Sequence, residues 1–381
     1  MDFSLTEEQE LLKSTLREFL TSYCTEEWIQ ATEQKGEYPY DLHERMAKLG
    51  LYGLVVPEEY GGSGGGMIEA AIVSEEIGRT SGSIGQVHMP SAVFGGYALL
   101  AAGPELKERF LPQLAEGTLK LSFALTEPEA GSDAASVRTR AVRDGDEFVI
   151  SGAKIFSTAA DTADYLVLTA RTGTPEERHR GLTLFLVDAK APGISTSRIP
   201  KIGHHAVQSP EVGLDDVRVP ADLVIGEVGG AWPALNDVMD AERIAVAALC
   251  TGLAQRCIDV ALEYGMQRRQ FGRQIATFQA ISHMFAEMET ETSAARLLTF
   301  HSAWLKDQGL PCSKAASIAK VYATECASRT ASRAVQVHGG YGYTAEYEVS
   351  RHFKEAKLYE VAGGSTQIQR NIIAREMGIR G

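Results

Sequence analysis

The residues whose types and spacing most clearly suggest a ligand site form the short turn Val361-Ala362-Gly363-Gly364-Ser365-Thr366, which lies between two segments with helical spacing. Ser365 or Thr366 can cap the second helix, whose first turn then offers free backbone N–H groups. A helix start of this kind can bind an anion or another polar ligand. A simple corner between two helices explains the same pattern, and this stretch alone favours that simpler interpretation.

Two other segments place hydroxyl groups after expected strands. In the segment 124–133, ALTEPEAGSD, an apolar run ends in Thr126 and a turn, and in the segment 152–158, GAKIFST, Phe156 and Thr158 follow a run with strand spacing. Taken separately, segment 124–133 is also explained by an ordinary turn, and Phe156 in segment 152–158 by an aromatic residue of the core. Together, they can present hydroxyls and backbone amides to the edge of a planar heterocycle, with Phe156 stacked on its face.

Two further segments lie in the C-terminal half. The segment 268–274, RRQFGRQ, sets three arginines beside a glycine, as in a clamp for a pyrophosphate, although a solvated basic turn is the commoner explanation. The segment 336–343, QVHGGYGY, allows close backbone approach. It lacks a preceding strand and a GxGxxG pattern, so it does not indicate a Rossmann dinucleotide site.

These segments must be positioned by three regions of different character. Residues 1–120 have mostly helical spacing, and residues 121–228 hold short β-branched and apolar runs between turns, which predict a small barrel or sandwich. Residues 229–381 hold long amphipathic segments that predict a helical bundle. These segments are Trp232–Gln267, Ile275–Gln308, Ser313–His338 and Tyr347–Val361.

Composition restricts the class of protein further. The 381 residues suggest two or three domains, and a content of 44% hydrophobic and 23% charged residues is typical of a soluble globular protein. The net charge of −13 argues against nucleic acid or an anionic membrane as a partner. No stretch approaches the unbroken apolar length that spans a bilayer, and the acidic N-terminus resembles neither a secretory signal nor a transit peptide. Five cysteines without CxxC spacing indicate free thiols in a reducing cytoplasm and no metal site.

Four of these segments together carry a resemblance to a known family. The chain resembles the acyl-CoA dehydrogenases over essentially its whole length, because TEPEAGSD, RRQFG with FQAI, QVHGGYGY and GGSTQIQ occur in the family's order and spacing. The resemblance implies a multidomain α+β fold: an N-terminal helical domain (1–120), a middle β-barrel (121–228) and a C-terminal four-helix bundle (229–381). It also implies non-covalent FAD, an acyl-CoA substrate, an electron-transfer flavoprotein as partner and a homotetramer built as a dimer of dimers.

The resemblance further implies which residues bind cofactor and substrate. In the middle domain the matching FAD positions are Phe123, Leu125, Thr126, Ser132, Phe156 and Thr158. The positions that match FAD contacts from a partner subunit are Arg268, Phe271, Gln279, Gln336 and Gly340, and those that match contacts to the adenosine part are Ser365 and Gln367. The positions that match substrate contacts are Ser132, Arg243 and Gly363.

The chemistry implied is α,β-dehydrogenation of an acyl-CoA thioester, in which a carboxylate removes the α proton and the β hydrogen leaves as a hydride to flavin. Many relatives carry this base at the position of Gly363, which has no side chain to act as one. A branch that resembles isovaleryl-CoA and long-chain dehydrogenases carries it on the first bundle helix, where Glu242 matches. Glu242 also fits a plain surface charge, but its coincidence with a missing Glu at position 363 favours the base.

Several alternatives stay open. The residues around Gly363 and the N-terminus also resemble the crotonobetainyl-CoA reductase branch, which runs the chemistry toward reduction. A flavin-dependent monooxygenase on this fold needs no α-proton base, so Glu242 argues against that class. A carrier-protein-bound substrate, or a binding module without turnover, is a third class. By family position, residues 85–97 line the pocket floor, where Phe94 and Tyr97 favour a short or branched acyl group, whereas His204 and His205 suggest only a polar turn.

Overall fold

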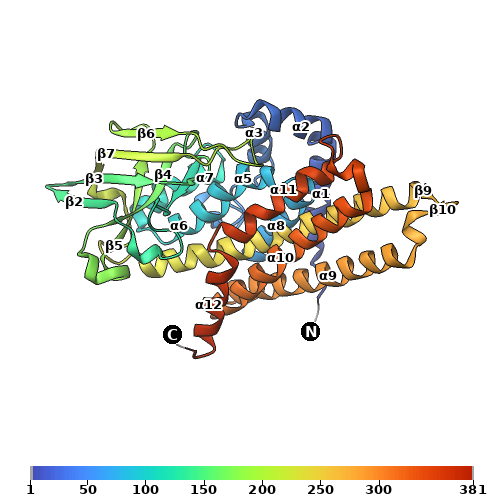
Figure 1. Cartoon of the computed structure of the whole chain (residues 1–381). Coiled ribbons are helices and arrows are strands. Elements are labelled where there is room, and N and C mark those ends of the chain that lie inside the picture. The colour runs from blue at the N-terminus through green and yellow to red at the C-terminus, as the bar shows by residue number, and fades with distance from the viewer. Residues whose placement is uncertain (1–2, 380–381) are drawn as a thin grey trace.

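The computed structural model describes residues 3–379, and the chain forms a helical N-terminal part, a sheet and a bundle of long helices (Figure 1). The N-terminal helices are α1 (Glu7–Tyr23), α2 (Glu26–Lys35), α3 (Tyr40–Lys48), α4 (Met67–Thr80), α5 (Gly82–Met89), α6 (Gly96–Leu100) and α7 (Pro104–Ala115). One π-helical segment, Pro90–Gly95, joins α5 to α6. The mostly helical region predicted for residues 1–120 is confirmed. The start of α2 is marked by Thr25, a cap that accepts a hydrogen bond from the backbone N–H of Trp28.

The middle part is an eight-stranded mixed sheet. Its strands are β1 (Leu121–Ala124), β2 (Arg140–Asp144), β3 (Glu147–Lys154), β4 (Tyr165–Arg171), β5 (Leu182–Asp188), β6 (Ile194–Ser197), β7 (Glu211–Pro220) and β8 (Val224–Ile225). The order is β6-β7-β3-β2-β4-β5-β8, with β1 added parallel to β4. The short strands predicted for residues 121–228 are confirmed, although β6, ISTS, is so short and exposed that its sequence carries little strand signal.

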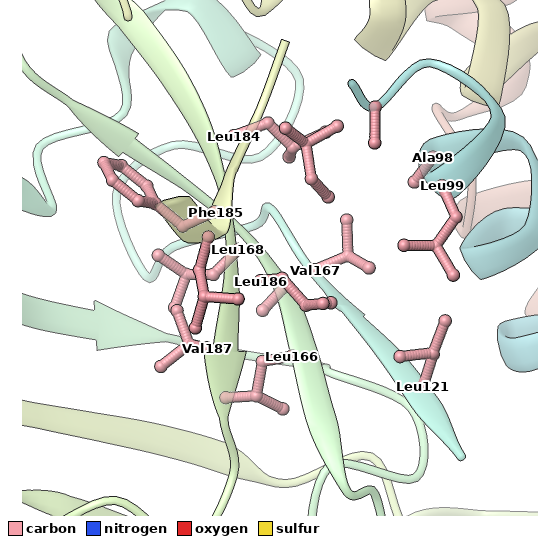
Figure 2. Close-up of a cluster of buried hydrophobic side chains, with 14 of the residues drawn as sticks. Ala98, Leu99, Leu121, Leu166, Val167, Leu168, Leu184, Phe185, Leu186 and Val187 are labelled. Carbon is pink, nitrogen blue, oxygen red and sulfur yellow. The ribbon is translucent and has the colours of Figure 1, made fainter. Parts of the chain in front are cut away.

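The sheet shares its hydrophobic core with the helices on either side. Figure 2 shows Val167 of β4 and Leu184 and Leu186 of β5 on the side of the strands that faces Ala98 and Leu99 of α6, whereas Leu166, Leu168, Phe185 and Val187 lie on the other side, within the same hydrophobic cluster. The same cluster extends to Leu235 and Val238, which lie on the first long helix of the bundle. Burying one such side chain stabilises the fold by about 1.5–3 kcal/mol. The end of β1 is therefore fixed between the helical domain and the bundle.

The C-terminal part consists of α8 (Trp232–Gln267), α9 (Gln279–Asp307), α10 (Ser313–His338), α11 (Glu348–Val361) and α12 (Thr366–Glu376), with the hairpin β9 (Arg269–Gln270) and β10 (Arg273–Gln274) between α8 and α9. Glycines let α4 and α8 cross closely, since a Cβ on Gly252 would lie 1.9 Å from the carbonyl oxygen of Glu75. Contrary to the sequence expectation, α8 has a stretch long and apolar enough to cross a membrane by length and composition. Of that stretch, 83% is buried inside the molecule, as in a core helix.

A group of buried charges joins all three parts, and we call Glu26, His204, Arg351, His352 and Glu355 the interdomain charge cluster. Glu355 of α11 accepts hydrogen bonds from the hydroxyl of Ser81 (2.6 Å) and from Arg351 (3.3 Å), and Arg351 also binds Glu26 of α2 at 2.5 Å. His204, from the middle part, lies 3.2 Å from the carbonyl oxygen of Glu355 and is 2% exposed. The polar turn predicted here is present, since a turn begins at His205, but the side chain of His204 beside it is buried.

Candidate active site

Glu242 of α8 and Gly363, on the turn between α11 and α12, lie side by side although 121 positions separate them in the chain. A Cβ atom on Gly363 would stand 2.8 Å from Glu242 Oε1. Both residues are half-buried. Gly363 and Gly364 have φ angles of +62° and +78°, which glycine adopts without the steric penalty of a Cβ. The turn thus leaves space that the Glu242 carboxyl group fills.

The surroundings of Glu242 control its ionisation. Burial raises the pKa of Glu242, and the nearby charges of Arg243 and Lys320 oppose this rise without cancelling it. Arg243 is buried and donates to Asp240 at 2.5 Å, and its Nε has no hydrogen-bond partner among residues 3–379. A carboxyl group with a raised pKa is a stronger base once it is ionised, which suits proton abstraction from carbon.

A buried lysine on α10 holds the turn of residues 362–364 by hydrogen bonds. Lys320 of α10 is fully buried and donates to the carbonyl oxygens of Ala362 (2.8 Å) and Gly364 (2.5 Å). Burial lowers the pKa of Lys320 to about 8. Gln369 of α12, also buried, donates to the carbonyl oxygens of Gly363 and Gly364 at 3.0 Å each. All three carbonyls of residues 362–364 are thereby hydrogen-bonded.

The start of α12 follows this turn directly. Ser365 caps the helix by accepting a hydrogen bond from the N–H of Ile368 at 3.4 Å, whereas Thr366 is the first helical residue. The sequence prediction of a cap at one of these two residues is confirmed. Gln367 is exposed beside it.

The two strand ends singled out in the sequence also adjoin. The N–H of Ile155 donates to the carbonyl oxygen of Thr126 at 2.9 Å, and Lys154 donates to the carbonyl oxygen of Leu125 at 3.1 Å. Lys154 is fully buried and pairs with Glu127 at 2.8 Å. Burial lowers the pKa of Lys154 to about 8, while Lys154 and backbone N–H groups hold the pKa of Glu127 below its usual range despite burial. The segments ALTEPEAGSD and GAKIFST therefore form one continuous surface.

The side chains on this surface match the chemistry of a planar heterocycle. Phe156 is 59% exposed and held at φ +58°, an unusual conformation for an aromatic residue. Thr158 Oγ1 lies 3.2 Å from the hydroxyl of Ser209, and the buried hydroxyl of Ser157 has no partner among the described residues. Phe123, Leu125 and Thr126 are half-buried, and Ser132 is exposed. An exposed ring beside free polar atoms fits an isoalloxazine system.

The remaining predicted residues lie elsewhere in the chain. Arg268 and Gly340 border one open hollow of about 510 Å³, which Tyr264, His338 and Tyr341 also line. Gln279 and Gln336 are exposed, and Phe271, on the tip between β9 and β10, is 94% exposed. Figure 1 places this hairpin at the far end of the bundle from the sheet. Within one chain, these residues do not meet Thr126 and Thr158.

Three family profiles match the chain in order. They are the acyl-CoA dehydrogenase N-terminal domain at residues 6–118, the middle domain at 122–217 and the C-terminal domain at 229–378. The chain belongs to the acyl-CoA dehydrogenase family. It has the three-domain acyl-CoA dehydrogenase fold, and it is an FAD-dependent oxidoreductase of acyl-CoA thioesters.

Individual members of the acyl-CoA dehydrogenase family are similar along their full lengths. A probable acyl-CoA dehydrogenase, YngJ, from Bacillus subtilis is 39% identical over 99% of this chain and 100% of its own length. The caffeyl-CoA reductase-Etf complex subunit CarC from Acetobacterium woodii is 37% identical over 97% of this chain and 98% of its own. The structure of butyryl-CoA dehydrogenase from Megasphaera elsdenii superposes with a TM-score of 0.96, at 32% identity over 100% of both chains.

Two residues of this candidate site, Lys320 and Lys154, were not identified from the sequence. A signal for Lys320 existed, because it stands among alanines at helical spacing, Ala316, Ala319 and Ala323, all of them buried. A lysine in such an apolar stripe is costly unless its ammonium group is hydrogen-bonded. Lys154 gave a weaker signal, since it ends a strand beside a turn.

Proposed function

We propose that this chain catalyses α,β-dehydrogenation of an acyl-CoA thioester with Glu242 as the base. The observation that carries this proposal is the contact between Glu242 and Gly363. The turn with Gly363 has no carboxylate at the position where many relatives carry the base, and Glu242 of α8 places a carboxylate at that same point. The raised pKa of Glu242 supports the same role. A flavin monooxygenase needs no α-proton base, so a carboxyl group with a raised pKa at this point disfavours that class.

The residues then act as follows. Glu242 accepts the α proton of the acyl group, and the β hydrogen departs with its electron pair, so that a C=C bond forms between the two carbons. Bound FAD supplies the acceptor for that hydride. Arg243 and Lys320 hold positive charge near Glu242 and so favour its ionised form before the proton moves. Negative charge develops on the thioester oxygen during this step, so a hydrogen-bond donor must lie within reach of that oxygen.

We assign FAD binding to two sets of residues. Phe123, Leu125, Thr126, Ser132, Phe156 and Thr158 form the first set, at the strand ends. Arg268, Phe271, Gln279, Gln336 and Gly340 form the second set, and Ser365 and Gln367, at the start of α12, are assigned separately to the adenosine part. Because the hairpin with Phe271 lies far from the strand ends of its own chain, we propose that a neighbouring subunit brings the two sets together within a homotetramer (Figure 1). The exposed Phe271 ring supports burial against such a neighbour.

Reduction of an enoyl-CoA is the second candidate direction, and the similarity to CarC, which is named as a caffeyl-CoA reductase–Etf complex subunit, favours it. The same name supports an electron-transfer flavoprotein as the redox partner. A short or branched acyl chain is favoured by Phe94 and Tyr97, which pack where the sheet core meets the bundle core. The five cysteines, all buried and unpaired, fit a cytoplasmic location.

Anaerobic titration of the purified yellow protein with saturated acyl-CoAs of different length and branching tests the proposal. Loss of the flavin absorbance with one class of acyl group is the expected result, and it names the substrate. If no acyl-CoA reduces the flavin, but enoyl-CoAs reoxidise the reduced protein, the reductase direction is correct. Rapid reoxidation by oxygen alone would instead favour a monooxygenase.

A further inference from the structure

Lys320 is a buried lysine that no carboxylate of residues 3–379 contacts directly. Its ammonium group donates to the carbonyl oxygens of Ala362 and Gly364, which are the residues on either side of Gly363. Glu242 Oε1 lies against Gly363 itself. Lys320 and Glu242 therefore bind the same three-residue turn, from α10 and from α8 respectively.

The cost of burying Lys320 implies a specific purpose. A fully buried ammonium group loses its hydration, and two carbonyl oxygens replace only part of it. A neutral side chain could close the same turn, as Gln369 already does for Gly363 and Gly364. What the amide of Gln369 cannot supply is a positive charge.

We propose that Lys320 is a positioning residue for the reaction: it fixes the Ala362–Gly364 turn against Glu242, and its charge keeps the Glu242 carboxyl group ionised in a poorly hydrated site. This inference rests on the proposed role of Glu242 as the base. Lys320 does not touch the reacting atoms. It acts through the turn and through the electrostatic potential at Glu242.

The charged neighbours of both groups are few. Glu242 faces Arg243 on its own helix and Lys320 on α10. Lys320 faces Glu242, Arg243, the buried thiol of Cys250 on α8, and Glu360 on α11. Arg243 is already paired with a carboxylate, Asp240. Lys320 has no such ion pair among residues 3–379, so its charge is not compensated by a direct partner and acts on Glu242 in addition to the charge of Arg243.

The test is the pH dependence of flavin reduction by a substrate acyl-CoA, measured anaerobically with Lys320→Met and Lys320→Gln. Removing the positive charge raises the pKa of Glu242 further. The pH at which the rate of flavin reduction rises should therefore be about one pH unit higher than in the wild type. Lys320→Arg, which keeps the charge, should restore most of the shift. Lys201→Met is the control, because Lys201 is half-buried and donates to one carbonyl oxygen, that of Val207, but is not among the charges that act on Glu242.

Two further readouts separate the possible failures. FAD content and the thermal midpoint should fall less for Lys320→Met in a Glu242→Gln background, since a neutral side chain at position 242 no longer needs the charge. If Lys320→Met holds no FAD, Lys320→Gln serves in its place. An unshifted pH profile in FAD-loaded variants overturns the inference, whereas a wild type that no acyl-CoA reduces overturns the proposed function instead.

Discussion

Glu242 Oε1 lies 2.8 Å from the point where a β-carbon on Gly363 would stand, so these two positions cannot both carry a side chain in the present arrangement. The first bundle helix supplies the carboxyl group, and the turn before α12 supplies the room for it. The contact explains together two features that are far apart in the sequence, the glycine at position 363 and the glutamate on the first bundle helix.

Replacing Glu242 with glutamine should leave the fold and bound FAD intact and slow flavin reduction by acyl-CoA. Loss of a positioned general base costs about 10²–10⁴-fold. Stopped-flow reduction under anaerobic conditions measures the rate. A variant that reduces its flavin at the wild-type rate would remove Glu242 from the mechanism.

The same variant should be more stable than the wild type at neutral pH. Burial raises the folded-state pKa of Glu242 above its unfolded value of about 4.3, so the folded protein binds more protons between the two values and loses stability as pH rises through the folded pKa. Glutamine has no such loss. We expect its thermal midpoint to exceed the wild type's by about 1–4 °C above the folded pKa, with no difference below pH ~4. Equal midpoints at every pH would contradict the raised pKa.

Alanine at position 363 should displace the base. The new methyl group would overlap Glu242 Oε1, and a misplacement of about 1 Å can cost on the order of 10²-fold in rate. Gly145→Ala is the matched control, because Gly145 has nearly the same φ, +63°, but no atom within 4 Å of its Cβ position. Both variants should lose similar stability, whereas only Gly363→Ala should lose flavin reduction. A similar loss of activity in both would point to backbone strain instead.

Lys154→Met should destabilise the middle domain. It leaves the Glu127 carboxylate buried without its ion pair, a change that typically costs about 3–5 kcal/mol. It also frees the carbonyl oxygen of Leu125, so FAD retention should fall. Chemical denaturation measures the first effect and the FAD-to-protein absorbance ratio the second. The double variant Glu127→Gln/Lys154→Met should recover part of the stability, and no recovery would mean that the pair itself contributes little.

Phe271→Ser should leave the folded chain itself almost unchanged, because the ring is 94% exposed. If a neighbouring subunit covers this ring, the variant should bind FAD more weakly and dissociate at higher concentration than the wild type. Light scattering and the FAD-to-protein ratio report these effects. Ile202→Ser, at a residue that is 73% exposed on the middle domain, is the control and should change neither. Unaltered assembly in Phe271→Ser would place the subunit contact elsewhere.

The sequence predicted most of the elements because their signals are local. The long helices of the bundle begin and end within a few residues of the predicted bounds. The short strands expected in residues 121–228 are present, and β4, YLVLTAR, is a mostly apolar run of this kind. The position of Glu242 came from the resemblance, because a glutamate on a helix has no local signal for catalysis.

Long-range contacts were the part that could not be predicted. The burial of His204 against α11, the two carbonyls beneath Lys320 and the pairing of Lys154 with Glu127 all join residues distant in the chain. Hydrophobic periodicity carries no information about them, since each is polar and satisfied by a partner that the sequence does not name. Only the folded chain shows which polar groups meet.

The interdomain charge cluster also bears on how this protein can be re-engineered. Arg351 and Glu355 of α11 reach Glu26 and Ser81 in the first domain, and His204 enters from the second. Exchanging one domain for that of a relative would leave the buried charges of the other domains without their ion-pair and hydrogen-bond partners at the domain interfaces. Chimeras of this enzyme should therefore be recoverable only when Glu26, His204, Arg351, His352 and Glu355 are transplanted together with Ser81, which donates to Glu355.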